Sequence, residues 1–227
     1  MDTNTSSASE PRRRGRPAKA SLDAAALIRA AALDAFATHG FNGASIVDIA
    51  KAAAVAKPLI HYHFATKEAL WQAAVGEAFE CMKAEMAAFQ QSIVSSQRND
   101  LLRQVAKQMV IFASRHPQLV RIVVDETGKP GPRAEWLLEN YLLPGYRSAQ
   151  LLVAAFDSPR RTDARTPGPE HMVPMILGVM NFPFLDAEII HKAYGVDVFA
   201  ADYIQRHSEV VFTLLQAYYV PVDDHSS

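Results

Sequence analysis

The sequence has little that would suit an oxidising compartment or a membrane. Cys81 is the only cysteine among 227 residues, so no disulfide can form within the chain, and we expect a buried thiol in a reducing compartment. The longest apolar run, residues 172–185, is too short to span a bilayer and is interrupted by Pro174 and Pro183. The first residues are polar and then basic, unlike a signal peptide. These absences predict a soluble cytoplasmic protein without membrane contact.

Signatures of catalysis and of metal binding are also missing. We find no nucleophile elbow, no glycine-rich phosphate loop and no carboxylate–histidine cluster at ligand spacing. His61 and His63 are two positions apart on a predicted helix and point about 200° away from each other, so they cannot share an ion. His171, His191 and His207 have no ligand spacing either. We therefore predict no enzyme activity, no metal and no cofactor.

Charge is unevenly distributed along the chain. The net charge is −1, but residues 1–67 carry nine Lys/Arg against five Asp/Glu, and residues 68–227 carry fourteen against nineteen. Apolar residues make up 49% of the chain, enough for a sizeable core. A small basic module on a larger acidic one is typical of proteins that bind nucleic acid through one end.

Residues 45–70 carry the most specific pattern. Ser45 is a candidate N-cap, accepting from the backbone of Asp48, and an apolar stripe at helical spacing follows it. Residues 54–56 form a compact corner. Pro58 suits the first turn of a new short helix, and Thr66 caps a further one. Two short helices joined by a few residues predict a helix-turn-helix, whose second helix enters the major groove of DNA.

This segment resembles the DNA-binding domain of TetR-family transcriptional regulators. The residues that fit the family pattern, some by similar residues, are Ser45, Ile49, Ala50, Ala53, Val55, Ile60, His63, Phe64, Thr66, Lys67 and Glu68. Three positions depart from it: Ala54 replaces the usual turn glycine, Ala56 the usual capping Ser/Thr, and His61 a phosphate-contacting tyrosine. The first substitution predicts a strained positive φ, and the second the loss of a cap.

The resemblance implies an all-α fold, with an N-terminal three-helix DNA-binding domain and a six-helix domain for effector binding and dimerisation. We place a disordered basic tail at residues 1–21, the DNA-binding domain at 22–66 and the helical body at 67–227. The periodicity predicts helices at about 21–40, 45–52, 57–64, 67–91, 101–115, 117–127, 133–156 with a bend near Pro144, 171–193 and 199–219.

The expected DNA contacts lie around the recognition helix. They are Ser45, Lys57, Pro58, Leu59, His61, Tyr62, His63 and Lys67, while Ile60 and Phe64 are expected to face the core. Lys57 suits a guanine edge, and Lys67 suits a phosphate at a helix start. An ordinary solvated helix surface is the alternative interpretation for each of these residues.

Arg14 and Arg16, in the sequence Arg-Gly-Arg-Pro, resemble the core of an AT-hook, in which guanidinium groups enter a narrow A·T minor groove. A basic tail that binds the backbone without sequence preference is the alternative. The corresponding alternative for the whole protein is an architectural binder of A·T-rich DNA without an effector.

For the body, the resemblance implies a homodimer through the last two helices and a pocket for a small effector. We expect the effector to be apolar, and the candidate pocket residues are Met109, Phe112, Trp136, Tyr141 and Phe182, although aromatic stripes are more often plain core. Arg121, Asp125 and Glu126, on one predicted helix, could add polar contacts, with a solvated helix face as the alternative. Together these features predict a ligand-released repressor that binds a palindromic double-stranded DNA operator.

Overall fold

The protein is described by a computed structural model that places residues 18–92, 97–156 and 168–219, and these residues form helices with no strand. The N-terminal head consists of α1 (Ala18–Gly43), α2 (Ile46–Ala52) and α3 (Lys57–His63). The body consists of α4 (Lys67–Ser92), α5 (Arg98–Arg115), α6 (Pro117–Thr127), α7 (Pro132–Leu137), the π-helical turn η1 (Leu138–Leu142), α8 (Leu143–Phe156), α9 (Pro169–Leu185), α10 (Ala187–Tyr194) and α11 (Ala201–Tyr219). The predicted all-α fold with an N-terminal helix-turn-helix is confirmed.

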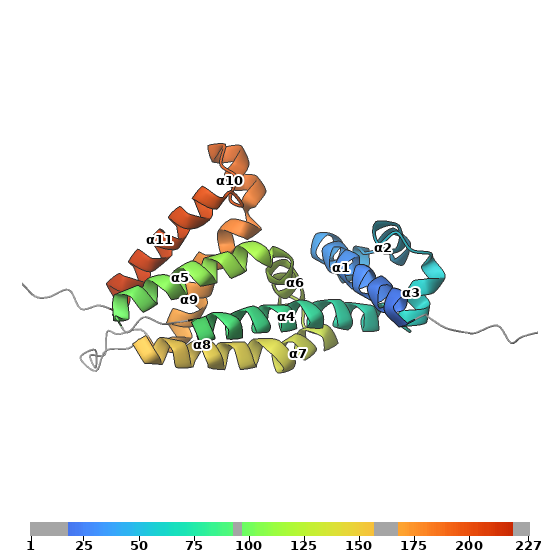
Figure 1. Ribbon diagram of the computed structural model, residues 1–227, viewed down its shortest axis with the longest axis horizontal. Helices are drawn as coiled ribbons and strands as arrows, with labels where there is room; N and C mark the ends of the chain where they lie inside the picture. The colour runs from blue at the N-terminus through green and yellow to red at the C-terminus, as the bar shows by residue number, and fades with distance from the viewer. Residues whose placement is uncertain (1–17, 93–96, 157–167, 220–227) are drawn as a thin grey trace, which may run out of the picture.

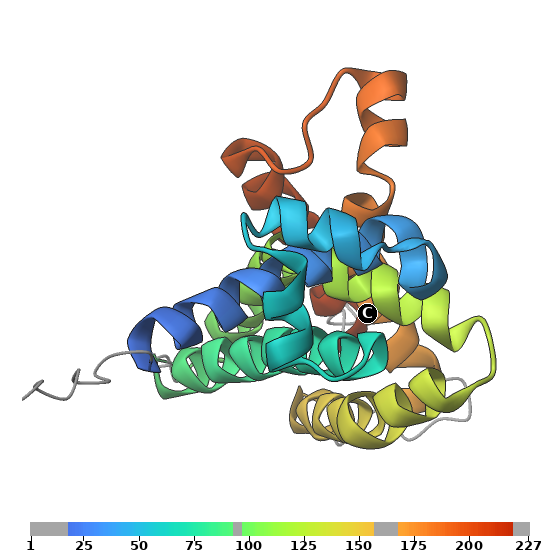
Figure 2. The same ribbon diagram turned by 90° about the vertical axis from the view of Figure 1, so that its right-hand side faces the viewer.

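The head sits at one end of an elongated molecule, and α4 runs from it along the body (Figure 1). The continuous helix formed by α7, η1 and α8 lies alongside α4, while α5 and α11 pack against each other on the other side of the body. Seen along the long axis, the head helices are nearest the viewer and α10 projects to one side (Figure 2). The recognition helix α3 is thus at the far end of the molecule from the body helices α8 and α11.

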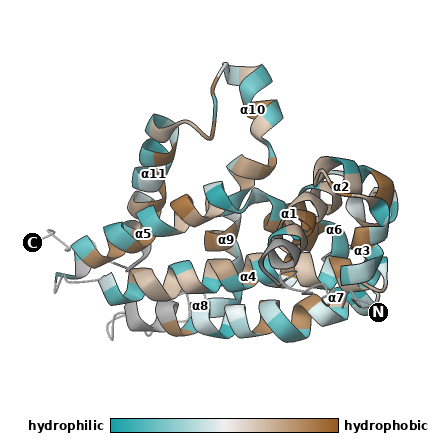
Figure 3. Ribbon diagram, turned by 45° about the vertical axis from the view of Figure 1, so that its right-hand side comes forward, coloured by the Kyte–Doolittle hydropathy of each residue, from teal (hydrophilic) through white to brown (hydrophobic). Residues whose placement is uncertain are grey.

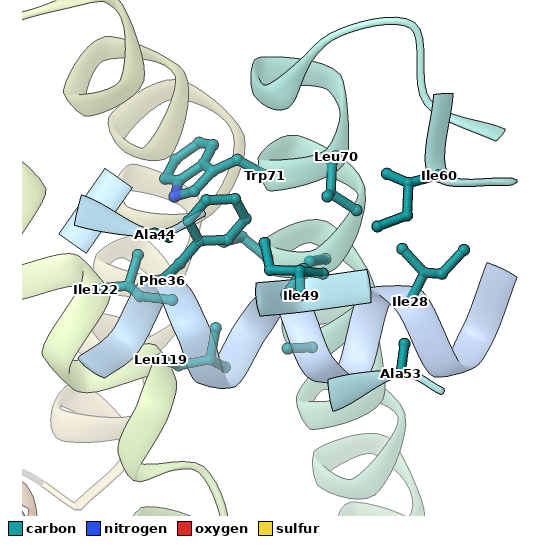
Figure 4. Close-up of a cluster of buried hydrophobic side chains, with 14 of the residues drawn as sticks. Ile28, Phe36, Ala44, Ile49, Ala53, Ile60, Leu70, Trp71, Leu119 and Ile122 are labelled. Carbon is teal, nitrogen blue, oxygen red and sulfur yellow. The ribbon is translucent and has the colours of Figure 1, made fainter. Parts of the chain in front are cut away.

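One hydrophobic cluster fills the head and continues into the body (Figure 4). Phe36 of α1 and Ile60 of α3 are buried together with Trp71 of α4 and Ile122 of α6. Apolar burial is the main favourable term in folding, so this shared core stabilises the head and the first body helices together. The expected boundary between residues 66 and 67 therefore crosses a continuous core.

A second cluster holds the rest of the body together. It joins α5, α9 and α11 through buried residues that include Leu102, Val110, Phe184 and Phe212. Apolar side chains also remain exposed on α10 and α11, among them Ile189, Val210 and Leu214. Figure 3 shows both brown and teal residues along these two helices. Among the described residues, no single helix is long and apolar enough to cross a membrane; α9 and α10 meet that test of length and composition only as a pair bent by 66°.

Three details differ from the sequence predictions. The helix predicted at 171–193 is divided at Asp186 into α9 and α10, because the chain turns sharply there. The bend expected at Pro144 is a π-helical turn just before it, where the backbone N–H of Leu143 donates to the carbonyl of Leu138. Cys81, expected to be buried, is exposed. It follows buried Phe79 by two positions on α4, which puts it on the opposite face of the helix.

Candidate DNA-binding interface

The corner between α2 and α3 has the strain that the sequence predicts. Ala54 has φ 53°, the one positive φ of a non-glycine residue in the described part of the chain. The backbone N–H of Val55 donates to the carbonyl of Ala50 at 3.0 Å, closing the turn. Ala56 lies at the N-cap of α3 without a side-chain hydrogen bond, as expected. Ser45 does cap α2, but it accepts from Val47 at 3.2 Å and not from Asp48 as predicted.

The recognition helix α3 has one buried anchor and an open outer face. Ile60 is buried against the head, as predicted, and Phe64 at the helix end packs partly against the same cluster. Lys57, Pro58 and His61 are exposed, Leu59 is half-buried, and Tyr62 is 77% exposed. The outer face of α3 therefore presents an ammonium group, an imidazole and a phenol around a fixed apolar anchor.

His63 does not lie freely on this outer face, as the sequence analysis placed it. It is half-buried, it packs edge-on against Tyr62 at 5.1 Å between ring centroids, and its Nε2 is buried without a hydrogen-bond partner. His63 is the last residue of α3, where the chain turns toward α4. This imidazole is therefore partly enclosed by its neighbours Tyr62 and Phe64.

Lys67 also has neighbours within the protein. Its Nζ lies 4.8 Å from the centroid of the Phe41 ring and donates to the carbonyl of Asn42 at 3.4 Å. Burial, followed by the charge of Arg133, lowers the pKa of Lys67. The ammonium group thus holds the end of α1 against the start of α4. Thr66 accepts from the backbone of Ala69 at 3.0 Å and caps α4, as predicted.

Arg14 and Arg16 lie outside the described residues. Within the described ranges, no group of three or more His, Cys, Asp or Glu side chains could hold a metal ion.

The arrangement at α3 is suited to binding by shape and hydrogen bonding in a groove of DNA, because its polar groups lie on the convex surface of a helix and do not line a cavity.

The comparisons with known proteins decide the family. The family model described as "Bacterial regulatory proteins, tetR family" matches residues 28–74, which cover most of α1, all of α2 and α3, and the start of α4. The "Probable HTH-type transcriptional regulator YttP" of Bacillus subtilis is 24% identical over 157 residues, 69% of this chain and 75% of that protein. Residues 28–74 therefore form a DNA-binding segment of the TetR type, in a chain that is similar to bacterial transcriptional regulators.

Solved structures of other regulators share this fold. A TetR-like transcriptional regulator from Rhodococcus sp. RHA1 superposes with a TM-score of 0.60 at 14% identity, covering 86% of this chain and 94% of its own. The FadR regulator of Bacillus subtilis, solved in complex with stearoyl-CoA, gives a TM-score of 0.59 at 16% identity, covering 84% and 96%. At these identities the likeness concerns the fold alone.

The five candidate effector residues are not brought together in one site. Trp136 and Tyr141 pack in the cluster shared with the head, with Tyr141 stacked on Phe79 at 4.3 Å. Met109 packs against the second cluster, and Phe112 is buried on the same helix. Phe182 is 59% exposed. Aromatic character alone does not distinguish core positions from surface positions: on α9, Phe182 is exposed whereas Phe184 is buried.

Two cavities lie elsewhere, and none of those five residues lines either of them. One, of about 480 Å³, lies between α5 and the start of α11 beside Ile111, Phe199 and Ile204. The other, of about 330 Å³, lies where the end of α1 meets the corner between α6 and α7, beside Phe41, Glu126 and Arg133.

Sequence reasoning missed Arg133. This residue follows the break at residues 128–132, and its guanidinium returns to Glu126, seven positions earlier, with Nε at 3.0 Å from both carboxylate oxygens. The signal in the sequence was a carboxylate on the apolar face of a predicted helix, followed by a turn and an arginine. The spacing of Glu126 and Arg133 across the break between two predicted helices does not by itself show that their side chains meet.

Proposed function

We propose that this protein is a repressor that binds a near-palindromic operator as a homodimer and is released by a small apolar effector. The observation that carries the proposal is the outer face of α3: Lys57, His61 and Tyr62 are exposed there, while Ile60 is buried and anchors the helix to the head. One short helix reads too few bases for specificity alone, so two heads in successive major grooves are required.

The roles we propose for the DNA contacts follow from side-chain chemistry. Lys57 donates to a guanine edge, Pro58 and Leu59 contact a thymine methyl group, and His61 and Tyr62 donate to phosphates. Ser45 and Lys67 are proposed to lie beside the backbone, and Lys67 would have to give up its contact with Asn42 to donate to a phosphate. His63 would contact DNA only after leaving its half-buried position.

The tail is proposed to add affinity through Arg14 and Arg16. Whether they act as an AT-hook depends on a narrow A·T minor groove beside the operator.

We propose that the two subunits pair through α9 and α11. Val211 is buried against the body, while its neighbour Val210 and the residue one turn later, Leu214, are 53% and 50% exposed on the outer face of α11. Met175 and Phe182 are exposed on α9. Apolar side chains at this spacing on two adjacent helices form a face that a second copy would cover.

We propose that the effector acts near the aromatic residues along α4. Trp136 lies 5.4 Å from Trp71 and 5.2 Å from Tyr141, between ring centroids. Gly76 leaves room for this group, because a Cβ there would lie 3.0 Å from the Tyr141 hydroxyl. Since Tyr141 belongs to the π-helical turn and α4 begins at the head, a ligand that displaced these rings would move α4. Met109 and Phe112 lie on α5, away from this group, and are not part of the proposed site, while Phe182 is reassigned to the subunit interface.

Selection from double-stranded DNA with a random central segment tests the DNA-binding function. We expect the wild-type protein to enrich a near-palindrome. Lys57→Ala should lose about 1–3 kcal/mol of discrimination at one base position in each half-site. Lys107→Ala is the matched control, because it removes the same charge from an exposed lysine in the body. Absence of any enriched sequence, or equal effects of the two variants, would contradict the proposal.

A further inference from the structure

Arg133 connects four helices at the junction between the head and the body. From α7, its Nε lies 3.0 Å from both carboxylate oxygens of Glu126 on α6, and Nη1 lies 3.4 Å from the Glu68 carboxylate on α4. Its guanidinium carbon lies 3.8 Å from the centroid of the Phe41 ring near the end of α1.

The position of Arg133 is fixed by a buried charge. Glu126 is only 5% exposed, and a buried carboxylate is strongly unfavourable unless it is paired and hydrogen-bonded. Burial acts to lower the pKa of Arg133, but the hydrogen bond to Glu126 and the charges of Glu126 and Glu68 outweigh it and raise that pKa. The guanidinium stays charged, and the place where it meets Phe41 is set by Glu126.

The end of α1 also lies close to Asp125 on α6 and to Lys67 on α4. Gly40 has φ 67°, so α1 bends there, and a Cβ on Gly40 would lie 3.1 Å from the Asp125 carboxylate. Lys67 lies over the Phe41 ring as well. The last turn of α1, which leads directly into the helix-turn-helix, is therefore seated on α4, α6 and α7 together.

Helix α6 extends this junction into the body. Leu119 and Ile122 on α6 are buried in the cluster that contains Phe36 of α1, and α6 also packs against α9, the helix we assign to the subunit interface. The angle of the head to the body thus depends on where α6 and α7 hold Phe41. In a dimer, that angle sets the separation of the two α3 helices on DNA.

We infer that Arg133 is a positioning residue for operator recognition: by joining Phe41 to Glu126 and Glu68, it sets the separation of half-sites that the dimer accepts. This inference rests on the proposed dimeric binding of an operator. It assigns Arg133 no contact with DNA. We assign this ion pair a role in conformational specificity, because replacing a buried ion pair by well-packed apolar residues often costs no net stability.

The test uses the full-length protein and the operator obtained by selection, with the two half-sites moved apart or together by one and two base pairs. Arg133→Met combined with Glu126→Gln removes the guanidinium without leaving an unpaired buried carboxylate. Arg103→Met combined with Glu209→Gln is the matched control. That pair also joins an arginine to a glutamate beside an aromatic ring, Phe212, but it lies between α5 and α11 in the body.

We expect the wild type and the body control to prefer one separation by tenfold or more over its neighbours. The junction variant should bind the best separation at least tenfold more weakly and should distinguish separations by less than about threefold. Its base preference within each half-site should be unchanged. Glu68→Gln, which leaves the buried pair intact, should show the same broadening to a smaller degree and serves if the double variant does not fold.

Retention of the wild-type spacing preference by a folded junction variant, with only a lower melting temperature, would make Arg133 a purely structural residue. An altered base preference would also overturn the inference, because Arg133 would then shape α3 itself. If the wild type shows no preferred separation or sediments as a monomer on DNA, the proposed dimeric function fails together with the inference. The first two outcomes leave that function intact.

Discussion

Single residues account for the strain in the helix-turn-helix. Ala54 replaces the turn glycine of the family and keeps the left-handed conformation, φ 53°, which costs an L-residue about 1–2 kcal/mol. The hydrogen bonds from Ala54 and Val55 to the end of α2 hold this conformation in place. Folding of the head therefore includes the free-energy cost of this strained backbone conformation, which a single substitution at Ala54 can remove.

We expect Ala54→Gly to raise the free energy of unfolding by about 0.5–1 kcal/mol, because relief of strain exceeds the greater freedom that glycine gives the unfolded chain. Chemical denaturation measures the change. Ala84→Gly, at an exposed helical position in α4, is the control and should lower the same quantity by about 1 kcal/mol. If both variants are less stable than the wild type, the strain at Ala54 is negligible.

His207 makes stability depend on pH. Burial lowers the pKa of His207 from its ordinary 6.5, while its hydrogen bond with the carbonyl of Val179 opposes the shift. The unfolded chain therefore binds a proton at higher pH than the folded protein does. The stabilising contribution is present above about pH 6.5 and declines as the pH falls from there toward the folded-state pKa.

Between pH 7 and pH 5, the free energy of unfolding should fall more steeply for the wild type than for His207→Gln, in which the amide can still donate to Val179. All other histidines are common to the two proteins, so the difference between the two curves reports on His207. Parallel curves would show that His207 has the same pKa in the folded and unfolded states.

At the scale of elements, the N-terminal caps of α3 and α4 differ. The start of α3 has no side-chain cap, whereas Thr66 caps α4 at 3.0 Å. The first turn of α4 holds Lys67 and Glu68, which contact the end of α1 and Arg133. A well-formed first turn of α4 is thus a condition for seating the head on the body.

Thr66→Ala should lower the free energy of unfolding by about 1 kcal/mol, since the backbone N–H of Ala69 loses its acceptor. Amide hydrogen exchange at residues 67–70 should become faster than exchange in the middle of α4. Thr66→Ser, which retains the hydroxyl, should behave as the wild type. Exchange that rises equally along the whole helix would place the effect in the core and not in the cap.

At the scale of the whole molecule, two clusters of buried residues divide the chain differently from its sequence motifs. The first contains the head and parts of α4, α6 and α7, and the second joins α5, α9 and α11. The proposed interface lies on the outer side of the second cluster, while the proposed DNA-binding face lies at the far end of the first. Helix α6 connects the two clusters, and so does the continuous helix formed by α7, η1 and α8, which packs against α9.

Introducing charge at the proposed interface tests the assembly. Val210→Glu combined with Leu214→Glu should convert the dimer to a monomer, because two carboxylates per subunit would be buried without partners. Sedimentation at micromolar concentration measures this, and binding to the selected palindrome should fall by at least tenfold. Val124→Glu, at an equally exposed apolar residue on α6, should leave both unchanged. A dimer that persists in the double variant would place the interface elsewhere.

The sequence by itself determined the all-α class, the helix-turn-helix and most helix boundaries, because caps, prolines and apolar spacing are local signals. α6 begins and ends at the predicted residues 117 and 127, and Ala54 has the predicted positive φ. The half-buried position of His63 and the separation of Trp136 from Met109 depend on which helices meet, which periodicity does not specify. The junction at Arg133 was decided by tertiary structure alone. A carboxylate on α6 is buried there only because α1, α4 and α7 close over it, and its burial then requires the arginine.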